Sequence, residues 1–69
     1  MHFVQFHNLS GGWEAFWAQD VKRVSQQEIN LPDGNKQFVT QVTFAVGAVM
    51  LREGYDDVMT KIVAAWQGE

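Results

Sequence analysis

Pro32, Asp33 and Gly34 lie between two stretches in which apolar residues alternate with polar ones, and this short segment restricts the possible folds more than any other. In one interpretation it is the turn of a hairpin, with Gly34 in the left-handed conformation that glycine tolerates best. In the other, residues 25–31 form a strand, and Asp33 or Asn35 caps a helix that starts after Pro32. The two interpretations lead to different folds.

Residues 36–52 contain evidence for both interpretations. Several of their side chains are β-branched and favour a strand, namely Val39, Thr40, Val42, Thr43 and Val46. Apolar residues also recur on one helical face, at Phe38, Val42, Ala45, Val46 and Val49. A strand over residues 36–46 would carry apolar side chains on both faces and would need cover on both. We favour the helix because the pattern outranks single-residue propensity, and the hairpin is the alternative.

The remaining elements are predicted from local patterns. Residues 2–7 have the composition of a short strand, and residues 11–24 show helical spacing of apolar residues. Residues 25–31 alternate between apolar and polar and predict a strand with one buried face. Gly54 is placed just after the end of the middle helix. A last helix over 55–67 follows from an apolar stripe made by Tyr55, Val58, Met59, Ile62, Val63 and Trp66.

The composition indicates a single small domain that needs a partner. The 69 residues include no cysteine, so no disulfide supports the fold, yet 46% of them are hydrophobic, with three Trp and five Phe. A chain of this size buries only roughly 60% of its unfolded surface. We therefore expect a homodimer in which residues 1–24 form an N-terminal strand and helix and residues 25–67 form the rest of the domain.

The order of elements over residues 25–67 resembles the ribbon-helix-helix family. The segment "EINLPD" corresponds to that family's strand and its exit, and "LREGYDDVMTKIVAAW" to its turn and second helix. The resemblance implies a mainly α homodimer whose short strands pair between protomers into a ribbon. The alternative fold is α+β, with the order strand, helix, β-hairpin, helix.

The whole chain is also similar to small bacteriophage proteins that disable host regulators. Its length, its three Trp residues and its acidic balance, with a net charge of −3, underlie this resemblance. It implies a cytoplasmic protein of the bacterial host cell that binds and inhibits a transcriptional regulator, such as a LuxR-type quorum-sensing activator. A type IV pilus assembly ATPase is a further partner that it implies.

No catalytic, metal or cofactor site is expected from the sequence. A cysteine nucleophile and a glycine-rich phosphate loop are both missing. His2 and His7 are five positions apart, so on a strand they would lie on opposite faces. The apolar windows are too short to span a bilayer, and the N-terminus lacks the features of a signal peptide. The sequence therefore favours a binding protein over an enzyme.

DNA is the second-ranked partner. In the ribbon-helix-helix family the outward residues of the ribbon enter the major groove, and here these would be Gln26, Glu28 and Asn30. Asp56 and Asp57 occupy the helix start that would otherwise receive a phosphate. The net charge of −3 also disfavours binding to a phosphate backbone.

A protein partner is the first-ranked expectation. Interface hot spots are enriched in Trp, Tyr and Arg, and an acidic surface can compete for a basic groove. For the Trp residues a core role is the favoured account, and a solvated helix start explains the acidic cluster more simply. The candidate partner-binding residues are Trp13, Trp17, Arg52, Glu53, Tyr55, Asp56, Asp57 and Trp66.

Overall fold

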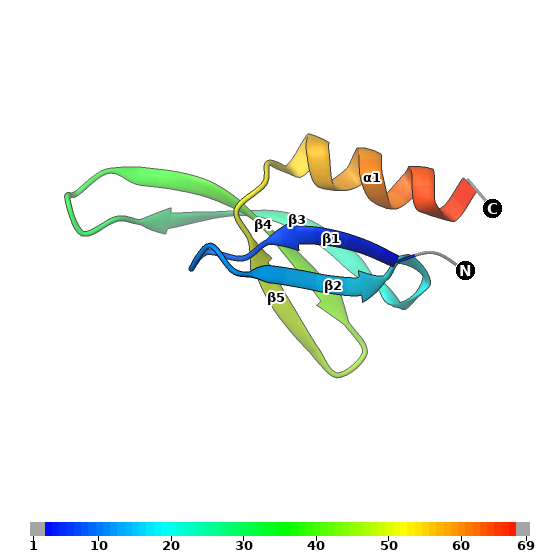
Figure 1. Ribbon diagram of the computed structural model, residues 1–69. Coiled ribbons are helices and arrows are strands. Elements are labelled where there is room, and N and C mark those ends of the chain that lie inside the picture. Colours follow the sequence, from blue (N-terminus) through cyan, green and yellow to red (C-terminus); the bar gives the residue numbers. More distant parts are fainter. Residues whose placement is uncertain (1–2, 68–69) are drawn as a thin grey trace.

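The computed structural model describes residues 3–67 and has an α+β fold (Figure 1). Five antiparallel strands and one 3-10 turn precede a C-terminal helix. The elements are β1 (Phe3–His7), β2 (Trp13–Trp17), η1 (Ala18–Asp20), β3 (Arg23–Asn30), β4 (Lys36–Phe44), β5 (Gly47–Leu51) and α1 (Tyr55–Gln67). The strand expected over residues 2–7 is β1, with His2 outside the described residues.

The first hairpin replaces the helix predicted over residues 11–24. β1 and β2 pair antiparallel, and the side chain of Asn8 organises their turn, because its Oδ1 accepts hydrogen bonds from the backbone N–H groups of Ser10 and Gly12. Gly11 has φ +93°, which only glycine adopts readily. The prediction was wrong because the spacing of Trp13, Phe16 and Trp17 fits one helical face, whereas in β2 the two Trp point outward and Phe16 points to the core. The turn and the pairing with β1 decide for the strand.

The second hairpin confirms the hairpin interpretation of the Pro-Asp-Gly segment. β3 pairs with β4 along its whole length, and Gly34 has φ +90° in the turn. The helix predicted over residues 36–52 is therefore wrong. Both faces of β4 are covered, since Val39 on one face and Val42 on the other are each buried. That double burial allows the β-branched residues to follow their strand propensity.

β5 continues the same sheet, and the last helix follows directly. Ala45 and Val46 form the tight connection between β4 and β5, in which Phe44 pairs with Gly47. Gly54 does not end a helix as predicted. It precedes α1, and its carbonyl accepts the first helical hydrogen bond. The helix predicted over residues 55–67 is confirmed.

The two sheets enclose one hydrophobic core beneath α1 (Figure 1). The order is β1-β2 in one sheet and β3-β4-β5 in the other, and an isolated bridge between Asn8 and Leu51 joins them. The backbone N–H of Arg52 also donates to the His7 carbonyl at 2.8 Å. The core consists of Val4, Phe6, Ala18, Val42, Leu51, Val58 and Ile62.

The mainly α, ribbon-helix-helix-like fold expected from the sequence is therefore contradicted. β3, the strand assigned to an intermolecular ribbon, pairs with β4 of its own chain. The alternative α+β order correctly contains the second hairpin, but its first helix is replaced by β2 and η1.

Candidate functional site

Strand alternation gives the β1–β2 hairpin an uncovered outer surface, which we call the aromatic face. Phe3, Trp13 and Trp17 on it are 55%, 64% and 43% exposed. Their rings are paired across the strands: Phe3 meets Trp17 edge-on with centroids 5.3 Å apart, and His7 lies against Trp13 at 4.1 Å. Alternation and register assign to this face Phe3, Gln5, His7, Trp13, Ala15 and Trp17.

Glu53 holds one end of the aromatic face in place. Its carboxylate accepts hydrogen bonds from the backbone N–H of His7, and its Oε2 lies 3.0 Å from His7 Nδ1. Burial by itself raises the pKa of Glu53, but these hydrogen bonds and the charge interaction with His7 outweigh burial and lower that pKa below 4.5. Glu53, which lies 46 positions away in the sequence, thus orients the His7 ring that lies against Trp13.

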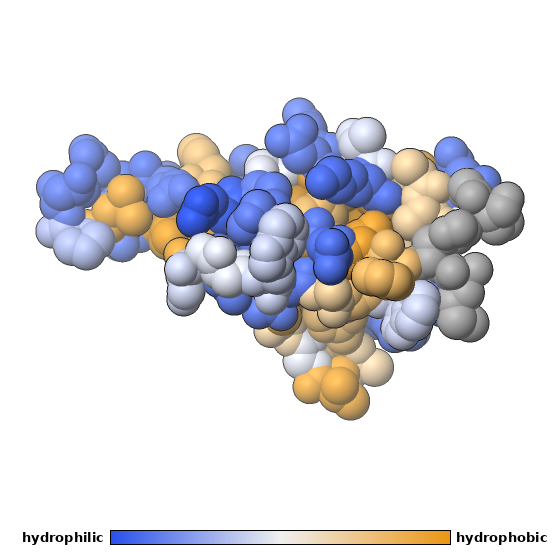
Figure 2. Space-filling view, viewed as in Figure 1, coloured by the Kyte–Doolittle hydropathy of each residue, from blue (hydrophilic) through white to orange (hydrophobic). Residues whose placement is uncertain are grey.

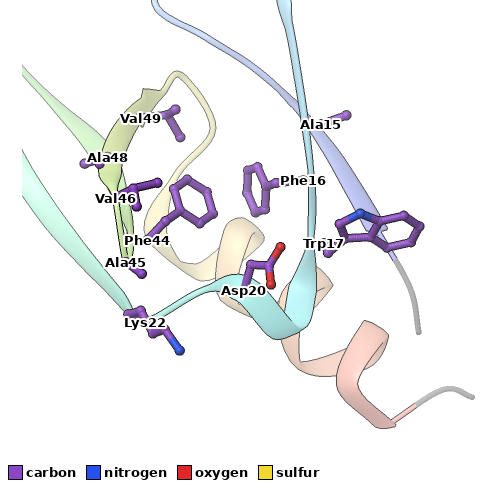
Figure 3. Close-up of a pocket in the computed structure, with 11 residues that line it drawn as sticks. Ala15, Phe16, Trp17, Asp20, Lys22, Phe44, Ala45, Val46, Ala48 and Val49 are labelled. Carbon is purple, nitrogen blue, oxygen red and sulfur yellow. The ribbon is translucent and has the colours of Figure 1, made fainter.

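An apolar groove of about 640 Å³ opens between β2 and the β4–β5 hairpin (Figure 3). Phe16 from β2 and Phe44 from β4 point toward each other and meet edge-on at its floor, with ring centroids 5.0 Å apart. Its outer wall ends at the tip of the β4–β5 hairpin, where Val46 is 98% exposed and Figure 2 shows hydrophobic surface. The groove is lined by Ala15, Phe16, Trp17, Asp20, Lys22, Phe44, Ala45, Val46, Gly47, Ala48 and Val49.

The other candidate residues lie apart from the aromatic face. Tyr55, Asp56 and Asp57 border a polar hollow at the start of α1, with Gln26 of β3 on its other side. Trp66 lies at the far end of the helix, half-exposed, and its Nε1–H donates to the carbonyl of Ala18 at 2.8 Å. These residues therefore do not form one continuous site with Trp13 and Trp17.

Arg52 lies close to the turn of the first hairpin. It is exposed, and a side chain added at Gly11 would meet its guanidinium at 3.3 Å. Its neighbour Glu53 is committed to His7, so only Arg52 of this pair presents its charge to solvent near the aromatic face.

The three residues considered for base recognition are exposed on β3, but their setting differs from the expected one. Gln26 adjoins the acidic start of α1, and Glu28 forms an ion pair with Lys36 at 3.8 Å. Asn30 is opposite Lys36 in the intramolecular hairpin. β3 forms a hairpin with β4 of its own chain, so these residues do not have the setting of a ribbon-helix-helix strand followed by a helix.

Two pairs of residues in the candidate surfaces are not among the residues predicted from the sequence. Phe3 and His7 complete the aromatic face, and Phe16 with Phe44 forms the floor of the apolar groove. Phe3 and His7 could have been found by aligning "FVQFH" with "WEAFW" as a hairpin, because this alignment places an aromatic ring opposite each Trp. The groove depends on how the two sheets pack and leaves no local signal.

Comparison with protein-family models, with curated proteins and with solved structures found no significant match. Among residues 3–67, no cluster of His, Asp or Glu is arranged to hold a metal ion. The single helix in this part of the chain is too short to cross a membrane. The aromatic face and the apolar groove are the candidate sites that the structure of residues 3–67 presents.

Proposed function

We propose that this chain is a small, non-catalytic binding protein that recognises another protein through the aromatic face of its β1–β2 hairpin. The observation that supports this proposal is the pairing of the exposed Trp13 and Trp17 with His7 and Phe3 on one uncovered surface. Aromatic rings held in place before binding give large contact area at little entropic cost.

The composition of this surface favours a protein over a nucleic acid. Proteins that stack single-stranded bases on aromatic rings also need basic residues along the backbone path. The segment from Phe3 to Trp17 contains neither Lys nor Arg, and the chain has a net charge of −3. A ribbon-helix-helix repressor is not proposed, since the fold on which it depended is contradicted.

The proposed consequence of binding is inhibition of a regulatory protein in a bacterial host, with a transcriptional activator or a pilus assembly ATPase as the partner types expected from the sequence. A compact scaffold that carries rigid aromatic anchors can act by occupying a surface that its partner needs elsewhere. Such an inhibitor works at a one-to-one ratio with its target and needs no chemistry of its own.

Site-specific photo-crosslinking tests the position of the binding surface. A photoreactive residue in place of Gln5, at the centre of the aromatic face, is compared with one in place of Gln26, which adjoins Asp56 and Asp57. Both glutamines are exposed, so the two positions are matched. In bacterial cells we expect a discrete crosslinked product from position 5 that disappears with Trp13→Ala. A product from position 26 alone would contradict the proposal.

A further inference from the structure

One edge of β2 has no partner strand in the structure of residues 3–67. The sheet order is β1-β2, so β2 is paired on one side only. The backbone N–H of Asn8 donates to the Gly12 carbonyl at 2.8 Å, so Asn8 and Gly12 form a hydrogen-bonded pair of the antiparallel ladder. Hydrogen-bonded pairs then alternate, and the backbone groups of Trp13, Ala15 and Trp17 point away from β1.

His7 supports this assignment of the phase. Its backbone N–H donates to Glu53 and its carbonyl accepts from the Arg52 N–H, so neither group is used by its β2 partner Trp13. In a non-hydrogen-bonded pair of an antiparallel ladder, both residues direct their backbone groups outward. The outward groups of His7 are therefore bonded within the fold, whereas the outward groups of β2 have no partner strand.

This edge carries no Lys, no Pro and no bulge that would discourage pairing with another chain. Natural edge strands carry Lys, Pro or a bulge that discourages an added strand. β2 reads Trp-Glu-Ala-Phe-Trp, and its single charged side chain, Glu14, is turned back over its own hairpin to accept a hydrogen bond from Asn8 at 3.1 Å. The edge is short, apolar and open.

We propose that a second copy of the chain pairs with this edge, antiparallel, with Ala15 opposite the partner's Ala15. In this register Trp13 lies opposite the partner's Trp17, and every outward N–H and C=O of β2 meets a complementary group. A register centred on Glu14 would place two carboxylates side by side, which is destabilising. One centred on Phe16 would place Glu14 opposite η1, where the chain is no longer extended.

The proposed pairing extends the ring contacts that each protomer already contains. Phe3 packs against Trp17 and His7 against Trp13 within one hairpin. Across the two-fold axis the new neighbours are Trp17 and the partner's Trp13, so aromatic rings line up in two rows across four strands. The small Ala15 at the axis keeps the space between these rows free.

A second copy is a better occupant of this edge than a segment of another protein, because the edge is complementary to itself. The same strand supplies both halves of the ladder, and no like charges face each other in the stated register. The chain also has no disulfide, and its core is small for its content of Trp and Phe. The aromatic face stays open to solvent in this dimer, so the inference goes beyond the proposed function and can fail independently of it.

Charge substitution at the two-fold axis tests the proposal. We expect the wild-type chain to sediment at twice the protomer mass of 7.9 kDa. Ala15→Lys and Ala15→Glu should each sediment as monomers, because each places like charges opposite one another, whereas an equimolar mixture should restore a dimer. Gln5→Lys and Gln5→Glu are matched controls on the same face but on β1, and they should remain dimeric.

A cysteine at the same position gives a second measurement that does not depend on repulsion. The natural chain has no cysteine, so Ala15→Cys is the single thiol. Opposed hydrogen-bonded residues have Cα atoms about 5.5 Å apart, within disulfide range. Oxidation should join two Ala15→Cys chains through a disulfide and should leave Gln5→Cys without a covalent crosslink. A monomeric wild type at high micromolar concentration, or Ala15 charge variants that stay dimeric, would each overturn the proposal.

Discussion

The carboxylate of Glu53 accepts hydrogen bonds from the backbone N–H of His7 at 2.9 and 3.0 Å, and these two residues are 46 positions apart. The contact joins β1 to the segment between β5 and α1. The His7 ring in turn lies 4.1 Å from the ring of Trp13, measured between centroids. The same carboxylate therefore helps to hold the two sheets together and to orient one ring of the aromatic face.

Glu53→Gln should destabilise the fold and change its response to acid. We expect a loss of about 1.5–3 kcal/mol in the free energy of unfolding at neutral pH, the usual contribution of a hydrogen bond to a charged group. Because the pKa of Glu53 is lowered below 4.5 in the folded chain, the unfolded chain takes up its proton first as pH falls. The contribution of Glu53 is thus complete above pH 4.5 and is lost as pH drops through the lowered pKa. Urea unfolding at neutral pH and between pH 5 and 3 measures both effects.

Glu28→Gln is the control for this experiment. Glu28 is exposed, and its ion pair with Lys36 is long, at 3.8 Å, so its removal should change stability by less than about 0.5 kcal/mol. Its unfolding profile should follow the wild type through the acid range. If Glu53→Gln also followed the wild type there, the hydrogen bonds to His7 would not be stabilising the fold.

Val42→Ala and Val46→Ala should have very different effects, although the two residues are of the same type and four positions apart. Val42 is fully buried in the core, and its truncation leaves a cavity that should cost about 2–3 kcal/mol. Val46 is 98% exposed at the hairpin tip, so its truncation should change stability by less than about 0.5 kcal/mol. Urea unfolding monitored by circular dichroism compares them directly. A helix over residues 36–52 would place both on its apolar face, and equal losses would therefore contradict the hairpin.

The same two valines show why the fold was only partly predictable. Their spacing fits one face of a helix, and only the pairing of β4 with β3 and β5 separates them into core and tip. Helix α1 was predicted correctly because Val58 and Ile62 belong to a stripe that no nearby turn interrupts. The Pro-Asp-Gly segment predicts the turn between β3 and β4, but the helical periodicity of residues 36–52 favours a helix over that turn when the sequence is considered alone.

Individual residues of the candidate site could be predicted from the sequence, but their arrangement on one face could not. Trp13 and Trp17 stand out in the sequence, but their exposure follows from the strand they form and not from their identity. Phe3 and His7 join them through a register that the Asn8 turn fixes. The sequence therefore supplies the anchors, whereas their arrangement on one face depends on contacts between distant parts of the chain.

Gly34→Ala should destabilise the second hairpin, whereas Gly47→Ala should not destabilise the protein. Gly34 has φ +90° in the Pro-Asp-Gly turn, a conformation that side chains with a Cβ adopt at a cost of about 1 kcal/mol or more. Gly47 lies at the start of β5, and neither residue has a heavy atom within 4 Å of an added Cβ. The pair therefore separates backbone conformation from steric overlap. Thermal unfolding measures the difference, and a Gly34→Ala variant as stable as the wild type would show that the turn has a different conformation.

Trp66→Phe and Trp13→Phe should separate a structural tryptophan from one that is available for binding. The indole N–H of Trp66 donates to the Ala18 carbonyl at 2.8 Å and ties the end of α1 to η1. Phenylalanine cannot make this bond, so we expect a loss of about 1 kcal/mol in the free energy of unfolding. Trp13 is more exposed, and its ring contact with His7 can be kept by phenylalanine, so its replacement should cost less than about 0.5 kcal/mol.

Far-UV circular dichroism is the suitable probe for this pair, because the substitutions themselves alter tryptophan fluorescence. The expected order is a lower urea midpoint for Trp66→Phe than for Trp13→Phe, with equal dependence on urea concentration. Trp13→Phe should lower the photo-crosslinking yield from position 5 more than Trp66→Phe does, since only Trp13 belongs to the aromatic face. A Trp13→Phe variant that is strongly destabilised but crosslinks normally would assign Trp13 to the scaffold and remove it from the proposed binding surface.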